Sequence, residues 1–235
     1  MNESSLRRPA VVSDRPPALF PAWHGHPRRS RSLAITHDNV LYHADSRHNM
    51  RAGVPKEISK KVLELCERIT PGLQPTFISI TPNPDCEPAD CFVNVYRKVQ
   101  REGGRIQYGW SLWEWPEAFI EAEHHAVYEP LTGPPWLDIT PCDRGSRRRL
   151  FLPDDSATYD FENEGVLRDN VRLAFSDDPL IEELFKAARK RSAFYNQLPG
   201  VGVISISAVE DPERQKIERR VARATLALAQ KYDAK

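Results

Sequence analysis

Apolar residues recur at helical spacing in several parts of the chain. In the clearest case, Ile58, Val62, Leu65 and Ile69 follow the intervals of three and four residues that form one buried face. The same kind of spacing predicts helices over residues 55–69, 91–102, 162–175, 179–197 and 211–232. Asp90 is the expected N-cap of the second helix, and Gly103-Gly104 is expected to end it.

A second set of segments has the composition and bounding turn residues of β-strands. Strands are predicted at residues 75–80, 105–114, 119–129 and 136–140, with 149–152 as an added edge and 200–206 as a short strand or buried connector. The segments between 105 and 140 follow one another with only turns between them, which predicts an antiparallel sheet packed on the helix over 91–102. The expected fold class is therefore α+β.

Residues 1–33 differ in composition from the rest of the chain. They hold five prolines and six arginines against only Glu3 and Asp14, which is typical of a flexible basic arm. We expect an α+β core over 34–160 and a helical extension over 161–235 packed on it. Packing within the chain is the favoured role of the last helix, and a homodimer contact is the alternative.

Composition narrows the classes of protein further. The 235 residues are 40% hydrophobic and include five tryptophans, enough for a sizeable core. The chain has no apolar run of eighteen residues and no secretory h-region, so we expect no membrane partner and a cytoplasmic location. The basic arm lacks an aromatic stacking platform or a recognition helix beside it, which argues against nucleic acid as a partner. Four cysteines without CxxC spacing are expected to be reduced thiols.

Cys91 stands at the expected start of a helix. Unpaired amides and a partial positive charge at that position favour a thiolate, and a thiolate can attack a carbonyl carbon. The alternative is a small buried apolar side chain, which free cysteines commonly are.

Two adjacent histidines lie on the strand over 119–129. Strand alternation places Glu121, Glu123 and His125 on one face and His124 on the other, so both imidazoles cannot reach one thiol. A hairpin through 130–135 could bring Asp138 beside His125. Otherwise His125 is a core histidine and Asp138 a turn or cap residue.

These segments together resemble the core of the transglutaminase-like superfamily. The resemblance is carried by Cys91 at a helix start, the run Gly103-Gly104-Arg105-Ile-Gln-Tyr-Gly109-Trp110, the run His125-Ala-Val-Tyr-Glu129, and Trp136-Leu-Asp138, in that order. It implies a papain-like fold in which Cys91 is the nucleophile, His125 the general base and acid, and Asp138 the residue that orients the imidazole.

One position departs from the family pattern. Counted from the tryptophan, the family aspartate falls on Thr140, and Asp138 lies two residues earlier on the same strand face. Asp143 and Glu123 are the other candidates for the third catalytic residue.

Binding residues are proposed from the same segments. The resemblance implies that backbone amides near the nucleophile stabilise an oxyanion, and Asn83, Asn94 and Gln107 are candidates for a second donor. Trp110 and Trp113, with Trp115, could line a substrate groove, although core packing explains them as well. Arg147-Arg148-Arg149 could hold a substrate carboxylate, but a solvated charge run is favoured.

The sequence therefore predicts a cysteine-dependent acyl-transfer enzyme without a cofactor. Its substrate would be a peptide or a small-molecule amide or ester, and hydrolysis, deamidation and amide formation share the thioester step. One alternative is a metal enzyme that uses His124 or His125 with Glu121, Glu123 or Asp138. The other is a non-catalytic binding module of the same fold.

Overall fold

The computed structural model describes residues 52–142, 145–161, 168–197 and 211–233. The chain divides into two units, residues 1–31 and 32–235, and every described residue belongs to the second. The predicted basic arm and the predicted strand at 200–206 lie outside the described residues.

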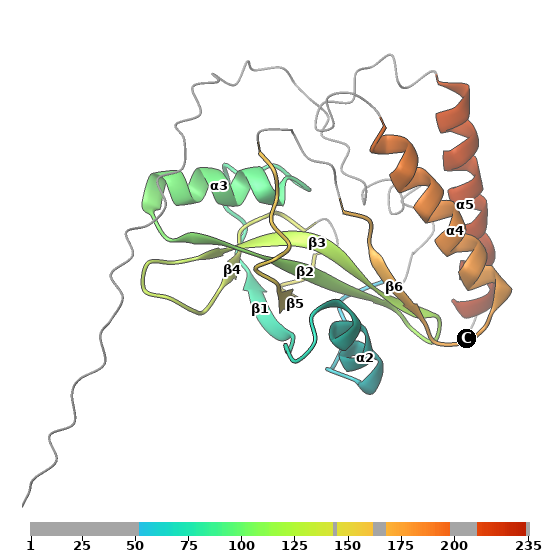
Figure 1. Ribbon diagram of the computed structural model, residues 1–235, viewed down its shortest axis with the longest axis horizontal. Coiled ribbons are helices and arrows are strands. Elements are labelled where there is room, and N and C mark those ends of the chain that lie inside the picture. Colours follow the sequence, from blue (N-terminus) through green and yellow to red (C-terminus); the bar gives the residue numbers. More distant parts are fainter. Residues whose placement is uncertain (1–51, 143–144, 162–167, 198–210, 234–235) are drawn as a thin grey trace, which may run out of the picture. The chain divides into compact units, whose positions relative to one another are not determined.

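Six strands form one sheet that closes on itself (Figure 1). They are β1 (Thr76–Ile80), β2 (Arg105–Trp115), β3 (Phe119–Glu129), β4 (Leu137–Asp138), β5 (Arg148–Pro153) and β6 (Val171–Ala174). The order is β2-β5-β1-β4-β3-β6, and β2 also pairs with β3, so five strands form a closed ring and β6 extends from β3. Neighbouring strands run antiparallel except β1 and β4, which are parallel.

Four helices are present among the described residues. They are α2 (Lys60–Ile69), α3 (Cys91–Glu102), α4 (Pro179–Tyr195) and α5 (Pro212–Tyr232). The Ser59 hydroxyl accepts a hydrogen bond from the Val62 amide and so caps α2, while Gly103, at a φ of 72°, ends α3. In the part of the chain that the structure describes, no helix has both the length and the apolarity to span a membrane.

The long β2–β3 hairpin determines which side chains share a face of the sheet. Its register opposes Gly109 to His125 and Ser111 to Glu123. On the same face, Ile78, Val127 and Phe151 meet in a small apolar cluster contributed by β1, β3 and β5, which marks the inside of the ring. His125 and Ser111 therefore point inward.

The outer face of the ring is covered by helices. Val62, Leu65 and Cys66 of α2 pack on the outward residues of β2, β3 and β5, and α3 packs on the outer face of β3 through Phe92 and Val95. Helices α4 and α5 pack on each other and on the Trp115 end of the hairpin. The C-terminal helices thus share a hydrophobic core with the strands.

Comparison with the sequence predictions confirms the α+β class, the cysteine-bearing helix on antiparallel strands and the two C-terminal helices. The helix predicted from residue 55 begins at Lys60 instead, because Ser59 caps it. Strand β5 was expected at an edge, but it lies between β2 and β1. The helix predicted over 162–175 is wrong for its described part, where Val171–Ala174 pairs with β3 as strand β6.

Candidate active site

Strand β3 pairs with β2 along one edge, and part of its other edge has no partner strand among the described elements. Strand β2 occupies the first edge over the whole hairpin, so β4 and β6 must share the second. On this second edge, β6 pairs with residues 119–122 and β4 pairs at Tyr128. Residues 123–127 have no partner strand on that edge among the described elements. A side chain from another element can reach the strand backbone at such a position.

The N-terminus of α3 fills this stretch with Cys91. The backbone amide of Ala126 hydrogen-bonds the Cys91 sulfur, and the cysteine packs with Phe92, Ala126 and Ile139. The thiol is therefore held beside the residue that directly follows His125. Cys91 is the first residue of α3, as the sequence predicts.

Burial governs the protonation of Cys91, which is only 7% exposed. Desolvation raises the pKa of the thiol, and the negative charges of Glu123 and Asp138 raise it further. The Ala126 amide and the charge of Arg149 oppose this shift but are outweighed. Cys91 is accordingly a neutral thiol at rest, not the thiolate that its helix position alone suggests.

The first turn of α3 presents its backbone amides close to this thiol. Asp90 occupies the N-cap as predicted, but its side chain makes no capping hydrogen bond. Its carbonyl accepts the Asn94 amide at 2.9 Å, and Ala89 before it has a φ of 61°, unusual for a residue other than glycine. A helix start of this kind has amide donors that can bind an anionic oxygen.

His125 and Asp138 lie together inside the ring. The imidazole Nε2 is 3.3 Å from Asp138 Oδ2, and the two residues are 3% and 0% exposed. Gly109 stands opposite His125, and a Cβ there would lie 2.2 Å from the Leu152 carbonyl oxygen, so only glycine fits. The predicted proximity of His125 and Asp138 is confirmed.

Both oxygens of the Asp138 carboxylate are bound. Oδ1 accepts the Thr140 backbone amide at 3.1 Å, and Oδ2 bonds Arg149 Nε as well as facing His125. Burial alone would raise the pKa of this carboxyl, but the charge of Arg149 and the neighbouring imidazole of His125 hold it well below its usual range. Asp138 is therefore ionised. Thr140, the position of the family aspartate, supports it through the backbone.

Arg149 is the site residue whose bond to Asp138 the sequence did not indicate. Its Nη1 donates to Ser111 Oγ at 2.6 Å, and its guanidinium lies 5.1 Å from the ring centre of Trp113. The expectation of a solvated arginine run is wrong at this position, because Arg149 is buried while Arg148 is exposed. Alternation along β5 is the signal that could have found it, since Arg149 shares a face with the inward Phe151.

Trp110, Trp113 and Asn94, which were predicted to bind substrate, are buried and bonded within the protein. Trp110 Nε1 donates to Asp154 Oδ2 at 2.9 Å, and Trp113 Nε1 donates to Glu123 Oε2 at 2.6 Å. Asn94 bonds both backbone groups of Glu87 and the Thr140 hydroxyl, so it secures the loop before α3.

The remaining candidates for an oxyanion donor or a third catalytic residue are placed as follows. Gln107 donates to the Tyr108 carbonyl and to Asp155, and Asn83 accepts the Asp85 amide. Asp143 lies outside the described residues.

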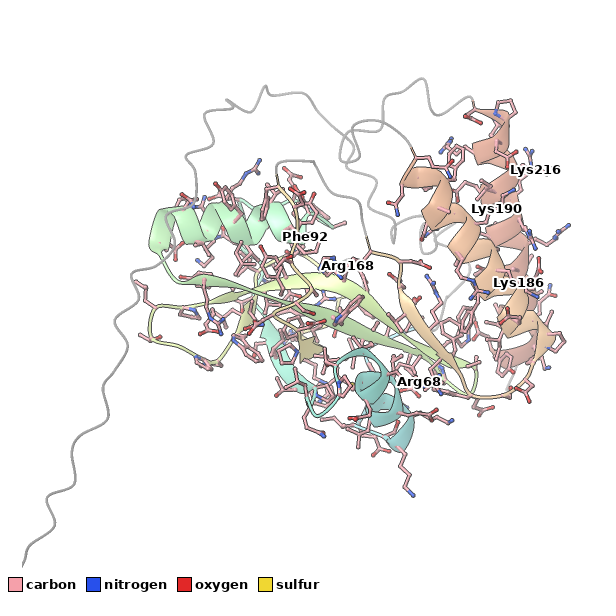
Figure 2. All side chains as sticks on the ribbon, in the orientation of Figure 1. Arg68, Phe92, Arg168, Lys186, Lys190 and Lys216 are labelled. Carbon is pink, nitrogen blue, oxygen red and sulfur yellow. The ribbon has the colours of Figure 1, made fainter. Side chains whose placement is uncertain are left out.

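His124 occupies the outer face of β3, away from His125. Its Nε2 lies 2.6 Å from the Ala157 carbonyl oxygen, and its ring contacts Phe92 and Trp110 at centroid distances of 4.7 and 5.5 Å. Phe92, on α3, is labelled in Figure 2. Burial lowers the pKa of His124 to about 4, so the imidazole is neutral. The described residues contain no group of three His, Cys, Asp or Glu side chains able to hold a metal ion, including the alternative set of His124, His125 and Glu123.

Comparison with known proteins finds no matching family model, no matching curated protein and no matching solved structure.

Proposed function

We propose that this protein is a cysteine-dependent acyl-transfer enzyme with a papain-like or transglutaminase-like core. The observation that carries the proposal is the position of Cys91: its sulfur is bonded to the Ala126 amide, next to His125, whose imidazole faces the buried Asp138 carboxylate. Nucleophile, base and orienting group come from α3, β3 and β4. That is the arrangement that activates a thiol.

The reaction begins with proton transfer and attack in one step. His125 Nε2 is directed at Asp138, and we assign to Nδ1 the role of accepting the proton of the Cys91 thiol as sulfur bonds to the substrate carbonyl carbon. The proton on Nδ1 then passes to the leaving amine or alcohol as its bond to carbon breaks. Water or an amine resolves the thioester, and its proton returns through the same imidazole to the thiol.

The raised pKa of Cys91 favours this concerted route over a preformed thiolate. A thiol that is buried and neutral at rest needs a base during the attack, and the base we assign is His125, the residue before Ala126, whose amide bonds the sulfur. The amides at the start of α3, which the Asp90 side chain does not cap, would support the developing oxyanion.

The resemblance to transglutaminase-like enzymes in the order of the sequence segments also supports the proposed function. Cys91, His125 and Asp138 follow one another as in transglutaminase-like enzymes. The contact between His125 and Asp138 favours Asp138 over Thr140 as the orienting residue, in spite of its displaced sequence position. The substrate we propose is a peptide or a small-molecule amide or ester.

An acyl-trapping experiment tests the proposal. The protein is incubated with activated p-nitrophenyl esters and with a cysteine-directed chloroacetamide, and adducts are located by mass spectrometry. We expect one adduct at Cys91, none in Cys91→Ser, and acylation slowed by about 100-fold or more in His125→Ala. His124→Gln is the matched control, because it alters the adjacent histidine on the opposite face. Adducts confined to Cys86, or equal rates in His125→Ala and the wild type, would refute the proposal.

The burial of Cys91 also favours a second candidate, a binding module of the same fold that performs no catalysis. In that case the thiol is a packing residue, and His125, Asp138 and Arg149 serve only as a polar core. A Cys91 alkylation rate at neutral pH no higher than that of a model thiol, and unchanged by His125→Ala, would decide for it.

A further inference from the structure

The Asp138 carboxylate is shared between two cationic or potentially cationic groups. Its Oδ2 faces His125 Nε2 at 3.3 Å and also bonds Arg149 Nε. Arg149 is held in turn by Ser111 through Nη1 at 2.6 Å and by the face of Trp113. A permanently charged guanidinium in a buried position lies as close to the carboxylate as the imidazole does.

We infer that Arg149 is a positioning residue that sets the proton balance of the site: by neutralising Asp138, it keeps His125 uncharged and therefore able to act as a base. An Asp–His pair by itself favours the imidazolium, because the carboxylate stabilises the positive charge. Arg149 supplies that charge permanently, so the imidazole need not carry it. The inference deepens the proposed function and rests on it for its catalytic consequence.

The other charged groups around His125 do not replace this effect. Strand β3 contributes Glu123 on the same face and neutral His124 on the opposite one, and α3 contributes the neutral Cys91 thiol. Strand β2 places Gly109 and Ser111 on this face, neither of which titrates. Glu123 is bonded to Trp113 on the hairpin. Among the described residues that bond or face the Asp138 carboxylate, Arg149 is the one that carries a fixed positive charge.

Loss of the guanidinium alone has a defined consequence. Asp138 would then interact with His125 without competition, and His125 would hold a proton at neutral pH. A protonated imidazole cannot accept the thiol proton, so the acidic limb of the activity profile would move to higher pH. If Arg149 were purely structural, its loss would reduce activity at every pH and would not move the acidic limb of the pH–activity profile.

The test follows the C2 proton of His125 by NMR as pH is varied in the full-length protein, with His125→Gln assigning the signal. We expect the titration midpoint to rise by about one pH unit or more in Arg149→Met. Arg149→Lys keeps the charge and should stay within about half a unit of the wild type, while the double variant Asp138→Asn/Arg149→Met removes both opposing charges and should also stay near it. The double variant keeps the test decisive if Arg149→Met does not fold.

The outcomes separate this inference from the proposed function. An unmoved midpoint in Arg149→Met, or an equal shift in Arg149→Lys, would overturn the role of Arg149 whatever the reactivity of Cys91. If Arg149→Met does not fold, a double-variant midpoint more than about one unit from the wild type overturns it. A raised midpoint together with a raised acidic limb of Cys91 acylation supports both proposals. A raised midpoint in a protein whose Cys91 cannot be acylated supports the role of Arg149 in keeping His125 uncharged and refutes the proposed acyl-transfer activity.

Discussion

The imidazole of His125 and the carboxylate of Asp138 come from different strands and face each other at 3.3 Å inside the closed ring of strands. Strand β3 meets β4 through the single pair Tyr128 and Leu137, and this register places Asp138 on the inward face with His125. One residue of slip would turn the carboxylate outward. This register therefore decides whether His125 and Asp138 meet.

Asp138→Ala should destabilise the protein strongly. The change leaves the buried Arg149 guanidinium without its carboxylate, and breaking a buried ion pair on one side costs about 3–5 kcal/mol of unfolding free energy. Urea denaturation measures the loss. Asp85→Ala is the matched control, since Asp85 is 72% exposed and 3.4 Å from Arg101, and it should change the free energy by less than about 1 kcal/mol. Similar losses in both variants would contradict a buried pair.

Acidification should destabilise the protein through His124. The pKa of this imidazole is about 4 in the folded protein against an ordinary value of 6.5, so the unfolded chain binds the proton first as pH falls. Stability is thus lost from about pH 6.5 downward, and this residue alone accounts for about 2 kcal/mol between pH 7 and pH 5. His124→Gln, which still has a donor for the Ala157 carbonyl, should flatten that part of the stability profile. Parallel profiles for the two proteins would exclude His124 as the cause.

Two leucines on α5 should respond very differently to truncation. Leu228 is fully buried against α4 and the hairpin end, so Leu228→Ala should cost about 2–5 kcal/mol of unfolding free energy. Leu226 is 44% exposed, and Leu226→Ala should cost less than about 0.5 kcal/mol. Thermal and urea unfolding of both variants measure the two changes in unfolding free energy within the same helix. A large effect at Leu226 that depends on protein concentration would instead indicate a dimer contact.

Asp178 should act mainly as the cap of α4. Its Oδ1 accepts the Leu180 amide at 3.0 Å, while Oδ2 bonds Lys231 and Tyr232 at the end of α5. Asp178→Ala should cost about 1–2 kcal/mol in urea unfolding. Asp178→Asn retains the cap through its remaining oxygen and loses the ion pair with the half-exposed Lys231 and the acceptor for the Tyr232 hydroxyl, so most of the stability should remain. Equal losses in the two variants would show that the link to α5 matters more than the cap.

Local patterns predicted most of the elements because they depend on neighbours in sequence. The apolar spacing of α3, α4 and α5 and the bounds of β1, β2 and β3 could be read to within a few residues, since helix and strand periods differ. Strand β6 was read as a helix because four residues carry little periodic signal, and its pairing with β3 comes from a distant segment. The insertion of β5 between β1 and β2 depends on the same long-range pairing.

The position of Cys91 at a helix start and the strand face that His125 shares with Glu123 could be predicted from the residues alone, because both follow from the backbone periods of a helix and a strand. Three features emerge only from the folded arrangement: Asp138 reaches His125, Arg149 is buried against the same carboxylate, and Cys91 is a neutral thiol bonded to the Ala126 amide. Strand register, closure of the ring and desolvation bring about these three features. Each depends on residues far apart in the chain and leaves no local pattern.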